Sequence, residues 1–150
     1  MGKMAQQKAQ SQEVKQFGQQ MAQDHDAANS ELMAVASGKG ADMPKGLDKD
    51  HTKLRDKLAK LNGADFDREY MRQMVKDHQK DVKDFEKEAK SGQDSDIKNF
   101  AQSTLPKLQQ HLQMAQDIDK RIRAEAPMTS QRSTAPGGTA GSSAPPATRR

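Results

Sequence analysis

The chain has 150 residues, which is the length of one domain, and only 32% of them are hydrophobic and 3% aromatic, whereas 31% are charged. It contains no cysteine, so disulfides and thiolate metal ligands are excluded, and this absence is compatible with either redox compartment. The net charge of +4 owes three units to residues 127–150; residues 1–126 interleave 22 basic with 21 acidic residues without a basic stripe, so we expect no nucleic-acid partner.

The first predicted element is helical and is divided near Ser11. Residues 2–9 are compatible with a helix, and Ser11 is placed to cap a second start before Glu13. The second helix has one apolar face with steps of three or four residues, formed by Val14, Phe17, Met21, His25, Ala28, Leu32 and Val35. Gly38, Gly40 and Pro44 then break the chain.

Three further helical blocks follow, separated by Asn62-Gly63 and Ser91-Gly92. The last block begins near Ser95, and Pro106 predicts either a kink or a restart with Thr104 as the cap. Strands are not expected, since no segment alternates with period 2. The apolar faces are Leu47, His51, Leu54, Leu58 and Leu61; Phe66, Tyr70, Met74, His78, Val82, Phe85 and Ala89; and Ile97, Ala101, Leu105, Leu108, His111, Ala115, Ile118 and Ile122.

The C-terminal segment, residues 127–150, is rich in Pro, Gly, Ser, Ala and Thr. It offers almost no apolar side chain to bury, and such a segment cannot offset the entropy lost on ordering. We therefore predict an all-α domain over residues 1–126 and a disordered tail over 127–150. Removal of the tail is expected to change thermal stability little.

Two segments of the chain are similar to each other at an offset of 53 residues. Residues 17–25 read FGQQMAQDH and residues 70–78 read YMRQMVKDH, so Gln, Met, Asp and His coincide. A helical bundle built from two related halves has this appearance, although nine residues alone do not prove a duplication.

Three histidines lie in the middle of the three longest helical blocks, each on an apolar face: His25, His78 and His111. Mid-helix side chains of facing bundle helices converge in the core, and imidazole is a ligand for zinc, copper and iron. The pattern predicts a transition-metal site built from these three residues. The alternative interpretation is three core-edge histidines, each hydrogen-bonded to a neighbour. His51, on a short leucine face, is interpreted as structural.

Carboxylates near the histidines bear on the kind of metal. Di-iron bundles use Glu-x-x-His, and that spacing is absent here, so a di-iron oxygenase is disfavoured. Asp81 lies almost one turn after His78 and is a further ligand candidate. Asp24 and Asp77 stand about 100° around the helix from the adjacent histidine. They are candidates to orient a ring nitrogen, but solvated charges are the favoured interpretation.

Methionines supply a softer set of candidate ligands. Met21, Met74 and Met114 each lie about one helical turn from a candidate histidine. Thioether with imidazole suits Cu(I). Because methionine is also an adaptable core filler, a packing role stays open for all three.

In combination, these motifs are specific to one family. The stretches EVKQFGQQMAQDHDAANSELMAVA, LNGADFDREYMRQMVKDHQKDVKDFEKEA and FAQSTLPKLQQHLQMA, spanning roughly residues 2–118, resemble the bacterial family named domain of unknown function 4142. The resemblance implies a ferritin-like four-helix bundle with a short crossing helix, and export to the periplasm or outer membrane. It implies no established activity. By analogy with metal-binding ferritin-like groups it makes the three histidines plausible ligands.

The N-terminal end departs from the family pattern. Met1 begins inside the first helix, which is therefore expected to be truncated, and an acid that family members carry before this point is missing. No signal peptide is recognisable here, so a genuine start at Met1 predicts a cytoplasmic protein instead of a periplasmic or envelope one. A truncated first helix leaves apolar surface open, which predicts self-association through that end.

Three functional hypotheses follow. The first is a metal-binding bundle for metal sequestration or envelope stress protection. The second is a non-catalytic structural or interaction protein with structural histidines. The third, disfavoured by the thin carboxylate set, is a ferritin-like oxidoreductase. With no run of eighteen apolar residues, we expect no transmembrane segment.

Overall fold

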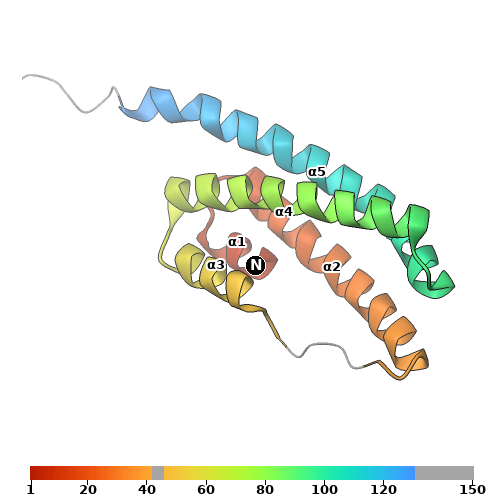
Figure 1. The fold of residues 1–150 in the computed structure, drawn as a ribbon. Helices are drawn as coiled ribbons and strands as arrows, with labels where there is room; N and C mark the ends of the chain where they lie inside the picture. The colour runs from red at the N-terminus through yellow and green to blue at the C-terminus, as the bar shows by residue number, and fades with distance from the viewer. Residues whose placement is uncertain (42–45, 131–150) are drawn as a thin grey trace, which may run out of the picture.

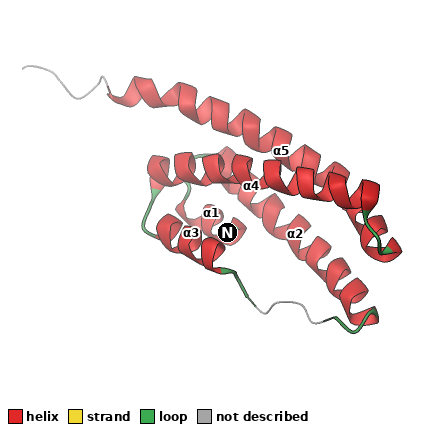
Figure 2. Cartoon of the chain, viewed as in Figure 1, coloured by secondary structure: helices red, strands yellow, loops and turns green. Residues whose placement is uncertain are grey.

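The computed structural model describes residues 1–41 and 46–130, and every regular element in these ranges is a helix (Figures 1 and 2). The one β-type contact among them is an isolated bridge between Ala9 and Gly63. The helices are α1 (Gly2–Lys8), α2 (Gln12–Gly38), α3 (Lys49–Ala59), α4 (Gly63–Ser91) and α5 (Ser95–Ser130). This architecture confirms the prediction of an all-α helical bundle.

The bundle is organised around α4 and α5, which run side by side in opposite directions and make the most extensive helix contact (Figure 1). The α2 helix packs on α5, and the short α1 folds back against the first half of α2. The α3 helix contacts α4 and inserts Leu58 into the core. The fully buried side chains gather where α1, α2 and α4 meet: Ala5, Val14, Phe17, Leu58, Phe66, Tyr70 and Met71, with Ala115 of α5.

The turn between α1 and α2 is held by a carboxylate from another helix. Ser11 occupies the N-cap position of α2, as predicted, but its side chain makes no capping hydrogen bond. The buried Asp67 of α4 instead accepts hydrogen bonds from the backbone N–H of Gln10 at 3.1 Å and of Ser11 at 2.7 Å. These contacts satisfy N–H groups at the helix start, which have no partner within the helix.

The close packing of α1 on α2 depends on Gly18. A Cβ atom at this position would lie 2.6 Å from Cβ of Ala5 and 2.8 Å from the carbonyl oxygen of Gly2. Both distances are too short for non-bonded atoms, so the absence of a side chain lets the two backbones approach.

Most predicted helix ends are confirmed. α2 ends at Gly38, α4 begins after Asn62, and α4 ends at Ser91. Pro44 lies outside the described residues, and so does the predicted tail from residue 131 onward.

Two features of α5 bear on the sequence predictions: its course at Pro106 and its C-terminal end. The helix continues through Pro106 without a new start. The carbonyl of Gln102, which loses its helical partner there, belongs to an exposed residue where water can bond to it. The helix also runs to Ser130, four residues beyond the domain boundary that we predicted at residue 126.

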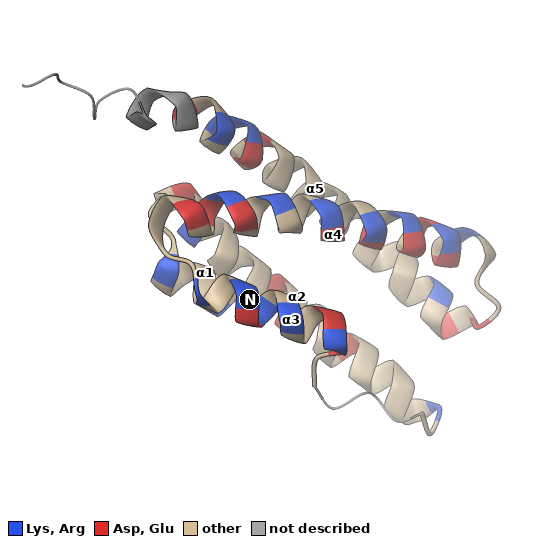
Figure 3. Ribbon diagram, turned by 60° about the vertical axis from the view of Figure 1, so that its left-hand side comes forward, with Lys and Arg blue, Asp and Glu red and all other residues tan. Residues whose placement is uncertain are grey.

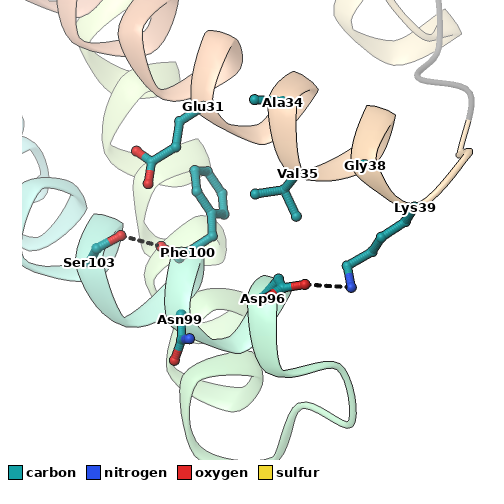
Figure 4. A pocket seen from close by; sticks show the side chains of 9 residues that line it. All are labelled: Glu31, Ala34, Val35, Gly38, Lys39, Asp96, Asn99, Phe100 and Ser103. Atoms are coloured by element: carbon teal, nitrogen blue, oxygen red, sulfur yellow. Dashed lines mark hydrogen bonds and ion pairs between the residues drawn. The ribbon is translucent and has the colours of Figure 1, made fainter.

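Ion pairs close the end of the bundle at which α2 stops. Lys39 Nζ lies 2.7 Å from a carboxylate oxygen of Asp96 (Figure 4) and 2.7 Å from one of Asp94, which joins the end of α2 to the start of α5. Elsewhere, basic and acidic residues are interspersed along α3 and α4 (Figure 3). None of the helices in the described ranges combines the length and apolarity needed to cross a membrane.

Candidate metal centre

The three histidines singled out from the sequence meet inside the bundle. His25 comes from α2, His78 from α4 and His111 from α5, and one ring nitrogen of each lies within 4.8 Å of the other two. The ring centroids are 5.5 to 5.7 Å apart. His78 and His111 are buried, with 3% and 1% of their surface exposed, and His25 is half-buried. We call these residues the three-histidine cluster.

The internal repeat explains how two of these rings are brought together. Phe17, Met21 and His25 follow each other at four-residue steps on α2, and Tyr70, Met74 and His78 do so on α4. Phe17 lies with its ring centroid 6.4 Å from that of Tyr70 and 6.4 Å from that of His78, so the two similar helical faces pack against each other. Each histidine then projects into the same layer, because residues four apart share a helix face.

Hydrogen bonds fix which nitrogen of two rings is free. The Nδ1 atom of His78 lies 2.8 Å from the carbonyl oxygen of Met74, and Nε2 of His111 lies 2.8 Å from Oδ2 of Asp24. Both partners are acceptors, so these nitrogens carry the protons and donate. In the neutral rings, Nε2 of His78 and Nδ1 of His111 therefore hold lone pairs. Both atoms are buried without a hydrogen-bond partner among the described residues.

Asp24 has a role that the sequence interpretation did not favour. Its Oδ2 accepts from His111, and its Oδ1 lies 3.6 Å from Nζ of Lys107. Partial burial raises the pKa of Asp24. The hydrogen bond from His111 and the charge of Lys107 together lower this pKa by more than burial raises it, so it falls below its ordinary value. A carboxylate behind a ligating histidine is the usual support in protein metal sites. Asp77, its counterpart in the repeat, instead accepts a hydrogen bond from Gln73 at 2.8 Å.

Burial also keeps two of the rings neutral. The pKa of His25 is lowered chiefly by burial and then by the nearby His78, against the opposing charges of Asp81, Asp24 and Asp26. The pKa of His111 is lowered chiefly by burial, against the hydrogen bond to Asp24. A lowered histidine pKa leaves lone pairs available near neutral pH, and only deprotonated rings bind metals.

Two cavities adjoin the cluster. The α1-side cavity has a volume of about 480 Å³ and is lined by residues of α1, α2 and α4, including His25 and His78, and by Leu47 and His51. The α5-side cavity has a volume of about 210 Å³ and lies between α2, α4 and α5, with His25 and His111 in its wall. Because His25 lines both cavities, each of them borders the three-histidine cluster.

The other ligand candidates are distributed unevenly around these cavities. Asp81 lines both cavities and is half-buried, and burial raises the pKa of its carboxyl. Met21 and Met74 line the α1-side cavity beside the histidines. Met114 packs against the hydrophobic core and lines neither of the two cavities.

His51 is not a member of the three-histidine cluster, although it lines the α1-side cavity. Its side chain is 50% exposed, and its Nδ1 lies 2.8 Å from Oδ2 of Asp48, which also caps α3 by accepting from the backbone N–H of His51. A further hollow of about 590 Å³ lies between the end of α2 and the start of α5, and residues such as Val35 and Phe100 line it (Figure 4). No histidine is among its described lining residues.

Comparison with known proteins identifies a family whose description names no function. The family described as domain of unknown function (DUF4142) matches residues 1–118, which confirms the resemblance seen in the sequence. No curated protein and no solved structure matches the chain.

Proposed function

The chain belongs to the DUF4142 family, whose description names no function, and we propose that it binds one transition-metal ion through His25, His78 and His111. The observation that supports this most strongly is the pair of buried, unpartnered nitrogens at Nε2 of His78 and Nδ1 of His111. Leaving a buried polar group unsatisfied costs about 1–3 kcal/mol. A metal ion between the rings would satisfy both nitrogens at once.

The donor set limits the identity of the ion. Three neutral imidazoles suit zinc, copper or iron, and three protein ligands leave a coordination position open for water or another ligand. Zinc–nitrogen bonds are about 2.0–2.1 Å long, so binding draws the rings slightly closer together. Met21 and Met74 lie in the cavity wall next to the histidines, which keeps Cu(I) among the candidates.

The same donor set supports a binding role over an oxidoreductase role. Di-iron enzymes of this architecture use four glutamates with two histidines, whereas the cluster in the described part of the chain contains nitrogen donors alone. We propose metal sequestration, or protection of the cell envelope from metal stress. The envelope location rests on what the family resemblance implies and stays a prediction.

A matched pair of histidine variants tests the proposal. His78→Gln removes a buried candidate ligand, and His51→Gln removes an exposed histidine that lies outside the cluster. Each purified, metal-free protein is titrated with Zn²⁺, Cu⁺ and Fe²⁺ by calorimetry, with circular dichroism as the check on folding. We expect His51→Gln to retain wild-type metal affinity and the metal affinity of His78→Gln to fall at least about tenfold. Loss of a supporting group already lowers metal affinity by about this factor, and loss of a ligand lowers it more.

The alternative hypothesis makes the opposite forecast for the same experiment. If the histidines are structural, His78→Gln and the wild type bind metal equally weakly, and the variant differs from the wild type in stability alone. Equal titration curves for the wild type and a folded His78→Gln protein contradict the metal-binding proposal.

A further inference from the structure

Hydrogen bonds hold two of the three rings of the cluster in place before any metal is bound. The ring of His78 donates from Nδ1 to the carbonyl oxygen of Met74, and that of His111 donates from Nε2 to Asp24, both at 2.8 Å. Asp24 is itself held, since its Oδ1 lies 3.6 Å from Nζ of Lys107. In metal sites such partners fix the tautomer and the orientation of a ligating ring. His78 and His111 therefore present their lone pairs from fixed directions.

The third ring, that of His25, has no such partner. Neither of its nitrogens hydrogen-bonds to a described residue, and the carboxylates of Asp24, Asp26 and Asp81 act on it through their charge alone. Its tautomer is therefore not fixed, and its side chain keeps the freedom to change between rotamers, which hydrogen bonds restrict in the other two rings. Of the three rings, His25 is held least firmly.

His25 is also the ring that is most open to solvent. It is half-buried, whereas 3% of the surface of His78 and 1% of that of His111 are exposed. Each of these two rings has a buried nitrogen without a partner among the described residues, and neither nitrogen of His25 is buried in this way, so solvent reaches its ring. His25 lines both cavities beside the cluster. A small molecule that enters either cavity therefore meets this ring.

We propose that His25 is the exchangeable ligand of the ion and that an external neutral nitrogen donor takes its place in the coordination sphere. This inference rests on the proposed metal-binding function and adds how the ion is passed on. In the exchange, the bond from the ion to His25 breaks and a bond to the incoming lone pair forms, with no change of oxidation state. The vacated space held an imidazole ring, so the donor that fits it is another imidazole, such as the histidine side chain of an acceptor protein. His78 and His111 keep the ion in place meanwhile.

Chemical rescue tests which position of the cluster accepts an external donor. The variants His25→Ala, His78→Ala and His111→Ala each remove one imidazole ring and leave a space of its size. The Zn²⁺ affinity of each full-length protein is measured against a chromophoric chelator, with and without added imidazole, and circular dichroism checks the fold. The wild type at the same imidazole concentrations corrects for the zinc that imidazole binds in solution.

We expect imidazole to raise the Zn²⁺ affinity of His25→Ala at least about tenfold, the lower end of the range for a group that supports a ligand. The affinities of His78→Ala and His111→Ala should stay close to their values without imidazole, because these two positions are closed to solvent. A folded His25→Ala protein that is not rescued, or a folded buried-histidine variant that is rescued equally well, overturns the proposal.

A second measurement uses the wild type and does not depend on the folding of any variant. The ring ¹⁵N resonances of histidine-labelled, zinc-loaded protein are followed as imidazole is added. We expect the resonances of His25 to move toward their metal-free positions while those of His78 and His111 stay. Resonances of all three rings that stay unchanged, or that move together, overturn the exchange alone. Absence of zinc binding by the wild type overturns the proposed function and the exchange with it.

Discussion

Asp24 and Asp77 occupy equivalent positions in the two repeats, each one residue before a histidine, yet only Asp24 supports a ring of the cluster. The reason lies in α5, the third of the helices that carry a histidine of the cluster. His111 and Lys107 are one turn apart on α5 and both lie beside Asp24, whereas Asp77 pairs with Gln73 of its own helix. Sequence spacing gives the angle of each carboxylate around its helix but not the partner that another helix presents. The contact of Asp24 with His111 therefore could not be predicted from the sequence and is seen in the structure alone.

That role leads to a prediction for Asp24→Asn. The amide oxygen can still accept from Nε2 of His111, but the negative charge that raises the basicity of the ring is lost. We expect metal affinity to fall about 10-fold, at the lower end of the range for loss of a group that supports a metal ligand. Calorimetric titration measures this, with Asp84→Asn as the control on an exposed stretch of α4. Unchanged affinity in a folded Asp24→Asn protein would show that the carboxylate does not support the centre.

The lowered pKa values of His25 and His111 predict how the metal-free protein responds to acid. The unfolded chain takes up protons near pH 6.5, whereas the folded state resists protonation until a lower pH, because burial disfavours the charged rings. Stability contributed by these residues is therefore fully present above pH 6.5 and is lost as the pH falls through 6.5 toward the folded pKa values.

Thermal melting of the metal-free protein between pH 8 and pH 5 measures this response. We expect the melting temperature to decrease across that range, and to decrease less in the variant His25→Gln, His111→Gln. A wild-type protein with the same melting temperature at both ends of the range, or a variant with an unchanged slope, contradicts the assignment of buried neutral rings.

Among the helices, the ends that depend on residues with special backbone properties could be predicted from the sequence, whereas the contacts between helices could not. The breaks at Gly38, Asn62-Gly63 and Ser91-Gly92 are confirmed, because glycine and asparagine are poor helix formers that are common at turns. On sequence grounds Pro106 predicted either a kink or a restart, and the continuous α5 excludes the restart. The approach of α1 to α2 at Gly18 has no signature in a single sequence.

Gly18→Ala tests that approach, and Gly38→Ala is its matched control. The added methyl at position 18 meets Ala5 and Gly2 at less than 3 Å, whereas at position 38 it meets nothing within 4 Å. Overpacking costs about 1–3 kcal/mol and the better helix propensity of alanine returns at most about 1 kcal/mol. We expect chemical denaturation to show a lower free energy of unfolding for Gly18→Ala and no loss for Gly38→Ala. Equal stability of the two variants would mean that α1 is not held against α2 as described.

At the scale of the whole molecule, the repeat and the apolar faces were sufficient to predict the all-α bundle and the meeting of His25, His78 and His111. Mid-helix positions on three long facing helices leave few other places for these rings. The same reasoning placed Met114 near the site, but it packs into the hydrophobic core instead of lining the cavities, because one turn along a helix also changes the layer that a side chain reaches. Self-association and the disordered tail stay predictions.

Metal content is the most direct test of whether the three-histidine cluster holds one transition-metal ion. Full-length protein without a tag is purified without chelator, challenged with zinc, copper and iron, desalted, and analysed by inductively coupled plasma mass spectrometry beside the variant His25→Gln, His78→Gln, His111→Gln. We expect close to one equivalent of one metal in the wild type and none in the variant. Retention of no metal by a wild-type protein whose circular dichroism shows a folded helical bundle would contradict metal binding by the cluster.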